Sequence, residues 1–146
     1  MKCVALLLMV LMFTGCLRFG DNIELAGVNF TSEHLRKISE RTGIRFPSGS
    51  QGINYFYQGD AIDPSLAAKI EIPKVSREEL LTNDVFKLGQ SEGINIHGGA
   101  TEEWWHPETL SSRLHFIQEL PKSCILECIV GDENGKLILY LKWATF

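Results

Sequence analysis

The sequence lacks the compact motifs by which many enzymes and nucleotide-binding proteins are recognised. It contains no HExxH pair, no nucleophile elbow, no P-loop and no dinucleotide fingerprint. Its histidines stand singly, as His34, His97, His106 and His115. His97 and His106 could ligate zinc with nearby acids, but histidines spaced this widely in a loop are usually surface residues. We therefore expect no metal, no cofactor and no catalytic residue recognisable from the sequence.

Basic residues are also scarce. The chain has 14 Lys and Arg against 18 Asp and Glu, a formal net charge of -4. Because affinity for nucleic acid depends on Lys and Arg at phosphates, this balance argues against a nucleic-acid partner. It also argues against docking on anionic lipid through a broad basic patch. There is no long polar tract, and 146 residues with 45% hydrophobic composition predict one globular domain.

No apolar run is long enough for an ordinary transmembrane helix, which needs about 20 residues. The longest run, residues 3–13, follows Lys2 and has the length of the hydrophobic region of a secretory signal peptide. A buried N-terminal helix is the alternative, but no polar face interrupts the run. A secretory signal without lipid is a second alternative.

The run ends in Phe13-Thr14-Gly15-Cys16, which resembles the lipobox of bacterial lipoproteins, with Phe13 where that family prefers leucine. The resemblance implies cleavage before Cys16 and acylation of that cysteine, for example with palmitate. Residues 1–15 are then a signal peptide, 16–22 a lipidated tether and 23–146 a single domain. The implied partner is the lipid bilayer of the cell envelope. Leu17, rather than aspartate, indicates the outer membrane in a Gram-negative host and otherwise the outer face of the cell membrane.

Several segments of the mature chain have a regular pattern. We predict a strand at residues 23–28 and a helix at 32–42, because Thr31 or Ser32 can cap its start and Gly43 its end. A second strand is expected at 53–58, with Ile53, Tyr55 and Tyr57 on one side. A third is expected at 66–72, where apolar and polar residues alternate.

The middle of the chain is less regular. Ser76 and Glu79 form a capping-box pattern, which predicts a second helix at 76–86. Residues 88–110 are rich in glycine and are expected to form a long loop with a short strand near 94–96. Residues 113–119 fit either a strand or a helical turn.

The C-terminal hairpin is the clearest structural prediction. Residues 124–130 and 136–143 flank Asn134-Gly135, a pair typical of a type I′ turn. With this turn, paired residue numbers sum to 269. Val130 then meets Leu139 on an apolar face, and Glu127 meets Lys142 as an exposed pair on the other. The pattern as a whole predicts an α+β fold: an antiparallel sheet with two helices packed on one face, as a two-layer sandwich.

Cys124 and Cys128 have two open interpretations. Residues four apart in a strand lie about 13 Å apart, which is beyond the reach of a disulfide. Buried, reduced thiols are therefore favoured. A disulfide would need a helical turn there, and the oxidising compartment would support it.

One segment suggests recognition. Neighbouring side chains point in different directions, so Trp104 and Trp105 cannot easily share one core, and one of them is expected to be partly exposed beside His106. Exposed aromatics are common anchors of protein interfaces. The alternative is that both indoles pack as a satellite core under the glycine-rich loop.

Four short segments, residues 41–47, 68–73, 104–107 and 139–143, resemble in that order segments of small uncharacterised bacterial lipoproteins. The resemblance implies an exported single domain and no catalytic residues. We therefore expect a non-enzymatic, membrane-tethered binding or envelope-associated domain, for which an envelope protein is a possible partner. Two alternatives stay open: an inhibitor or immunity-type lipoprotein, and an enzyme with a site assembled from scattered residues.

Overall fold

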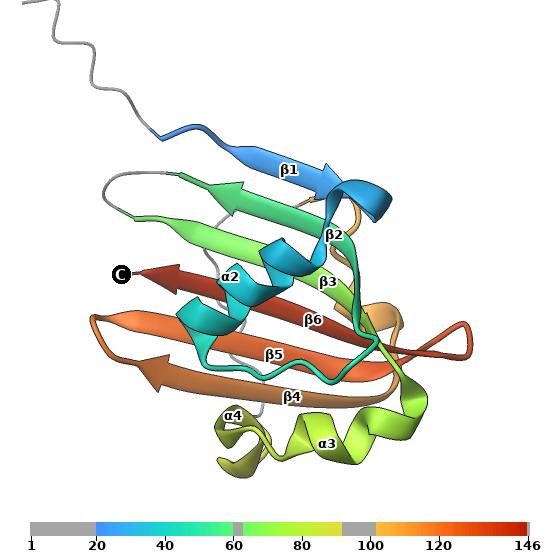
Figure 1. The fold of residues 1–146 in the computed structure, drawn as a ribbon. Coiled ribbons are helices and arrows are strands. Elements are labelled where there is room, and N and C mark those ends of the chain that lie inside the picture. The colour runs from blue at the N-terminus through green and yellow to red at the C-terminus, as the bar shows by residue number, and fades with distance from the viewer. Residues whose placement is uncertain (1–19, 60–62, 92–101, 146) are drawn as a thin grey trace, which may run out of the picture.

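The computed structural model describes residues 20–59, 63–91 and 102–145. Cys16 and the strand expected at 94–96 lie outside these residues. The described chain forms one six-stranded antiparallel sheet with a few short helices, so the expected α+β class with an antiparallel sheet is confirmed (Figure 1). The strand order is β1-β2-β3-β6-β5-β4. The strands are β1 (Ile23–Ala26), β2 (Gln51–Gln58), β3 (Ser65–Ile72), β4 (Ser111–Leu120), β5 (Cys124–Glu133) and β6 (Lys136–Thr145).

Helix α2 (Ser32–Thr42) occupies the predicted residues. Its N-cap is Thr31, whose backbone N–H and hydroxyl lie 3.2 and 2.9 Å from Nδ1 of His34. His34 thus takes the place that glutamate holds in the usual capping box. Gly43 ends the helix with a φ of 75°, the left-handed conformation that glycine adopts without strain. Leu35 and Ile38 are buried in the main core.

The C-terminal hairpin has the predicted turn and register. Asn134 and Gly135 have φ values of 50° and 81°, as a type I′ turn requires. Glu127 pairs with Lys142 and Val130 with Leu139, so the register with pairs summing to 269 is confirmed. The predicted apolar side of the hairpin lies in the main core.

Strand β2 differs from the prediction at its start. Gly52 pairs with Ile70 and Asn54 with Lys69, so Ile53 is the extra residue of a β-bulge. Tyr55 lies in the main core, whereas Ile53 packs with the second cluster that includes Trp104 and Trp105. The expectation that Ile53, Tyr55 and Tyr57 share one side was therefore wrong, because strict alternation does not continue across a bulge.

The single helix expected at 76–86 is also wrong. A 3-10 turn (Lys74–Ser76) leads into α3 (Arg77–Leu81), and α4 (Asp84–Lys87) follows after a break. Ser76 makes no side-chain cap, and Asn83 sits at the break with 3% exposure. The Asn83 amide accepts from Arg45 N–H at 2.8 Å and donates to the carbonyls of Arg45 and Leu80. These bonds stabilise the break, and sequence periodicity gives no indication of them.

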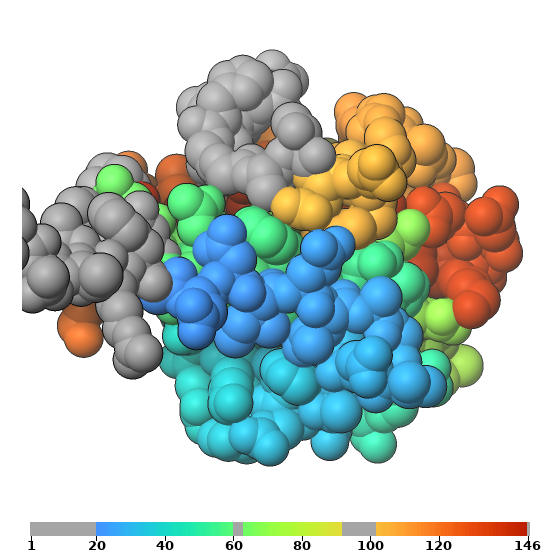
Figure 2. Space-filling view, turned by 90° about the horizontal axis from the view of Figure 1, so that it is seen from above, coloured from blue at the N-terminus to red at the C-terminus, as the bar shows by residue number. Residues whose placement is uncertain are grey.

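The two faces of the sheet are covered differently. The main core combines sheet residues with Leu35 and Ile38 of α2, Leu80 of α3 and Phe86 of α4, whose ring stacks edge-on with Phe116 of β4 at 5.0 Å. A smaller cluster lies on the other face: Leu110, Ile129, Ile138 and Tyr140, with Ile53, Trp104 and Trp105 against it. Figure 2 shows the segment that carries Trp104 and Trp105, in yellow and orange, on the side of the sheet away from α2, in cyan. We call this side the indole face.

Residues 113–119, left open between strand and helical turn, belong to β4. Cys124 and Cys128 are both free and buried in the main core, so the expectation of reduced thiols is confirmed. Burial and the nearby charge of Glu127 raise the pKa of the Cys128 thiol far above its usual range. Such a thiol is inert as a nucleophile at neutral pH.

Candidate functional site

The loop that carries the two tryptophans is held by its own backbone. The N–H of Trp105 donates to the Glu102 carbonyl at 2.9 Å, and that of His106 donates to the Trp104 carbonyl at 3.2 Å. A 3-10 turn (Pro107–Thr109) follows, with proline at the start, where no N–H is needed. Thr109 joins this loop to the sheet, because its hydroxyl lies 3.3 Å from Oε1 of Glu133.

Trp104 and Trp105, here called the indole pair, are both half-buried. The Trp105 ring meets the Tyr140 ring edge-on at 5.2 Å, and the Trp104 ring meets that of Trp105 at 5.9 Å. Nε1 of Trp104 is buried and has no hydrogen-bond partner among the described residues. The arrangement combines the two expectations from the sequence: the indoles pack on a satellite core, and each retains exposed surface.

Charged residues lie beside the indole pair. Glu127 of β5 is 4% exposed, and its Oε1 lies 2.8 Å from Nε2 of His115 on the neighbouring strand. Lys142 faces Glu127 in register, and its Nζ lies 5.8 Å from the centre of the Trp105 ring. We call the buried Glu127 and its half-buried neighbours His115 and Lys142 the buried charge cluster.

Burial governs the electrostatics of this cluster. Burial raises the pKa of the Glu127 carboxyl. This effect outweighs the hydrogen bond to His115 and the charges of His115 and Lys142, which lower the pKa. Burial also lowers the pKa of the Lys142 ammonium, against the opposing effect of Glu127. Both shifts move the groups toward their neutral forms, as expected for ions with little contact with water.

A second polar group lies across Tyr140 from this cluster. Nζ of Lys69 lies 2.7 Å from Oε2 of Glu133 and 5.2 Å from the centre of the Tyr140 ring. Burial disfavours the charge of Lys69, but its hydrogen bonds to Glu133 and Tyr140 outweigh burial and raise the pKa of the ammonium. Lys69, Tyr140 and Glu133 therefore lie beneath the loop, and their polar groups interact with one another.

The residues suggested by the sequence do not all come together. His106 is exposed, and its Nδ1 pairs with the exposed Glu108 at 2.8 Å. His97 lies outside the described residues, as does Cys16. Within residues 20–59, 63–91 and 102–145, no three His, Cys, Asp or Glu side chains are grouped to hold a metal ion.

The sequence reasoning missed the buried charge cluster. It described Glu127 and Lys142 as an exposed pair, which is wrong for Glu127, because the face opposite the helices is not open to solvent there. It assigned His115 no role. The available indication was Glu127 itself, a single acid within the otherwise apolar run Cys124–Val130 that would need a partner if buried.

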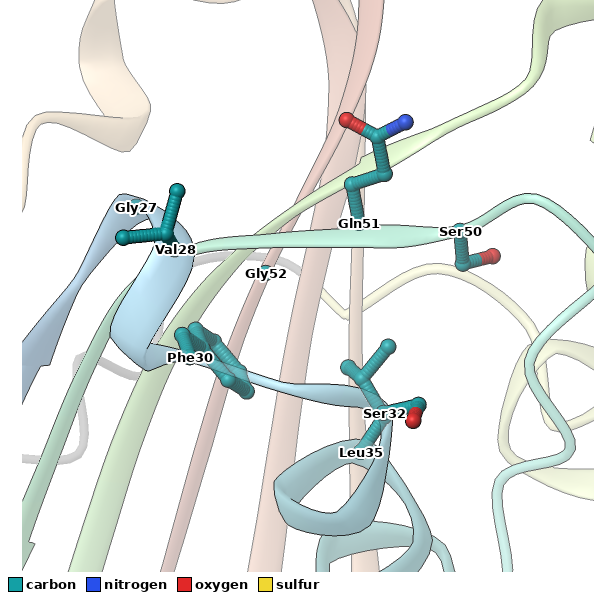
Figure 3. A pocket seen from close by; sticks show the side chains of 8 residues that line it. All are labelled: Gly27, Val28, Phe30, Ser32, Leu35, Ser50, Gln51 and Gly52. Carbon is teal, nitrogen blue, oxygen red and sulfur yellow. The ribbon is translucent and has the colours of Figure 1, made fainter.

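The described residues line several hollows on the side of the sheet that carries α2, among them hollows of about 320, 380 and 450 Å³. Figure 3 shows the one of 380 Å³, between the turn Gly27–Asn29 and the start of β2. The Phe30 ring lies directly below Gly52, where a Cβ atom would come within 2.2 Å of the ring. The described residues that line it carry no ionisable side chain. The hollow of 450 Å³ differs, because cationic side chains line it.

No family model, curated protein or solved structure matches the chain. The fold therefore defines only the class, an α+β domain built on an open antiparallel sheet. No helix in the described part of the chain is long and apolar enough to cross a membrane.

Proposed function

We propose that the protein is a lipid-anchored bacterial envelope protein whose domain binds a partner. The observation that carries the anchor is Phe13-Thr14-Gly15-Cys16 behind an apolar run. The described domain is consistent with it, because the first strand begins at Ile23, only seven residues after Cys16. Two or three acyl chains on Cys16 would hold the protein at the membrane stably. Because Leu17 follows the cysteine, the outer membrane is the proposed location in a Gram-negative host.

The anchor is tested by replacing Cys16 with serine. Only the thiol accepts the diacylglycerol, so Cys16→Ser should abolish acylation and leave the signal peptide uncut. Mass spectrometry of protein from the membrane fraction measures both. Cys3→Ser is the matched control, because it removes a thiol from the apolar run and should leave acylation intact. Wild-type protein without acyl mass at Cys16 would contradict the proposal.

For the domain, we infer that the indole face around the indole pair binds another envelope protein without chemical turnover. The support is that both indoles are only half-buried and lie beside charged groups, since aromatic residues often anchor protein interfaces. We also infer that α2, α3 and α4 form the second layer of a two-layer sandwich. The indole face is then the opposite side of the sheet.

A crosslinking experiment in intact cells tests this face. A photoreactive amino acid replaces Glu103, an exposed neighbour of Trp104, or the exposed Glu33 on α2 as the matched control. We expect a discrete crosslinked protein from position 103 and none from position 33. Trp105→Ala should weaken that crosslink at least fivefold. Equal crosslinking from both positions, or none from 103, would refute the assignment of the binding face.

One observation favours an enzyme as the second candidate function. A buried carboxyl with a raised pKa, 2.8 Å from a histidine, is an arrangement that acid–base catalysis uses. If this candidate is correct, Glu127→Gln should abolish turnover of the substrate while leaving its binding intact. An inhibitor or immunity-type role is a special case of binding, and the crosslinked partner would then be an enzyme or a toxin.

A further inference from the structure

The hollow of about 450 Å³ lies between the end of α2 and the turn that joins β4 to β5. It is lined on one side by Glu40 and Arg41 of α2 and on the other by Leu120, Pro121, Lys122 and Trp143. Arg41 and Lys122 are exposed, whereas Trp143 is 8% exposed and forms an apolar wall. The hollow therefore combines two cations with an aromatic surface.

Arg41 is held in place by aromatic rings. The centre of its guanidinium group lies 4.6 Å from the centre of the Tyr57 ring and 5.5 Å from that of the Trp143 ring. Contacts of this kind position the guanidinium without neutralising its charge. The N–H donors of Arg41 therefore remain able to bind an anion.

Among the described residues, neither cation of the hollow has a carboxylate partner. The ion pairs of the described residues include neither Arg41 nor Lys122. The one acid of the lining, Glu40, is paired with Arg36 instead. In a chain with a net charge of -4, two unpaired cations at one hollow favour an anionic occupant. Arginine beside lysine suits a phosphate group.

The hollow lies at the end of the sheet where the tether enters. Ile23, the first residue of β1, pairs with Tyr57, whose ring holds Arg41. The β4–β5 turn and the C-terminal end of β6 lie at this same end (Figure 1). Seven residues of extended chain span at most about 25 Å. A lipid on Cys16 would therefore keep this end within that distance of the bilayer.

We propose that this hollow, the anchor-end hollow, binds the phosphate of an anionic phospholipid headgroup through Arg41 and Lys122. The inference rests on the proposed lipid anchor. The overall negative charge argues against a broad basic patch. A headgroup site of two cations does not require such a patch, because the acyl chains already hold the domain at the membrane surface.

The test uses the mature, acylated protein in nanodiscs of phosphatidylcholine, with or without phosphatidylglycerol. Acyl mass at Cys16 is determined first. Acetic anhydride then labels the lysines, and mass spectrometry compares Lys122 with the exposed Lys136 at the opposite end of the sheet. A cation near an anionic surface gains about 1 kcal/mol, so phosphatidylglycerol should slow acetylation of Lys122 relative to Lys136 about fivefold.

Variants separate a site from a general effect of membrane charge. Arg41→Gln should remove most of the protection of Lys122. Arg113→Gln removes a positive charge at the far end of β4 and should leave the protection of Lys122 unchanged. Equal labelling in both lipids, or protection that survives Arg41→Gln, would overturn the proposal.

Two further outcomes are distinguished. Millimolar inorganic phosphate that protects Lys122 fully in neutral nanodiscs would mean a site for free phosphate, and would overturn the assignment to lipid. Missing acyl mass would refute the lipid anchor, and this inference with it. Normal acylation with unprotected Lys122 would refute the inference alone.

Discussion

Replacing His115 by leucine should destabilise the domain by about 1–3 kcal/mol at neutral pH, because the buried Glu127 carboxyl loses its hydrogen-bond partner. The Glu127 side chain is 5% exposed and that of His115 is 18% exposed, so water cannot replace the lost partner. Chemical denaturation measures the change in the free energy of unfolding. The same replacement in a Glu127→Gln background should cost much less, because no carboxylate is then left without its histidine.

His106→Leu is the matched control. His106 and Glu108 also pair at 2.8 Å, but their side chains are 58% and 63% exposed. An exposed pair contributes at most about 1 kcal/mol, so His106→Leu should change the free energy of unfolding little. Similar losses for the two histidine variants would show that Glu127 is not buried as described.

The effect of His115→Leu should also depend on pH in a defined direction. Burial raises the pKa of Glu127 in the folded state, and loss of His115 raises it further. A carboxyl whose pKa is raised in the folded state destabilises the fold at pH values above that folded pKa, where the carboxyl is charged. The effect is absent at pH values below the unfolded pKa near 4.5. The cost of the substitution should therefore decline as the pH falls toward and below 4.5.

Leu139→Ala should cost about 2–5 kcal/mol through the cavity that it leaves. Leu139 is fully buried on β6, between Ile70 of β3 and Val130 of β5. Thermal or denaturant unfolding measures the loss. Leu88→Ala removes the same atoms from a residue that is 62% exposed and should change stability by less than about 0.5 kcal/mol. A small loss at Leu139 would contradict the register of the C-terminal hairpin.

Elements with a strong local pattern were predictable. Asn134-Gly135 defines a turn type, and the alternation on both sides of it leaves one register with a continuous apolar face. Thr31 and Gly43 mark the two ends of α2 for the same local reason. The α+β class followed from these elements together.

Prediction failed where a distant contact outweighs the local pattern. Asn83 bonds to the backbone of Arg45, 38 residues earlier, and this contact stabilises a break where periodicity favours one helix. The bulge at Ile53 moves one apolar residue to the opposite face. A hydrophobic period of two or of 3.6 residues contains no information about the helix break at Asn83 or the bulge at Ile53.

The proposed lipidation motif at Cys16 consists of adjacent residues, so the amino-acid order alone was enough to derive it. The two candidate sites, around Glu127 and around Arg41, arise differently. Glu127 meets His115 only because β4 and β5 pair, and Arg41 meets Trp143 only because α2 lies over the sheet. Burial of Glu127, and with it the shift of its pKa, depends on what surrounds the carboxyl in three dimensions. Tertiary structure therefore decided the chemistry of both sites, because each joins residues that no local pattern connects.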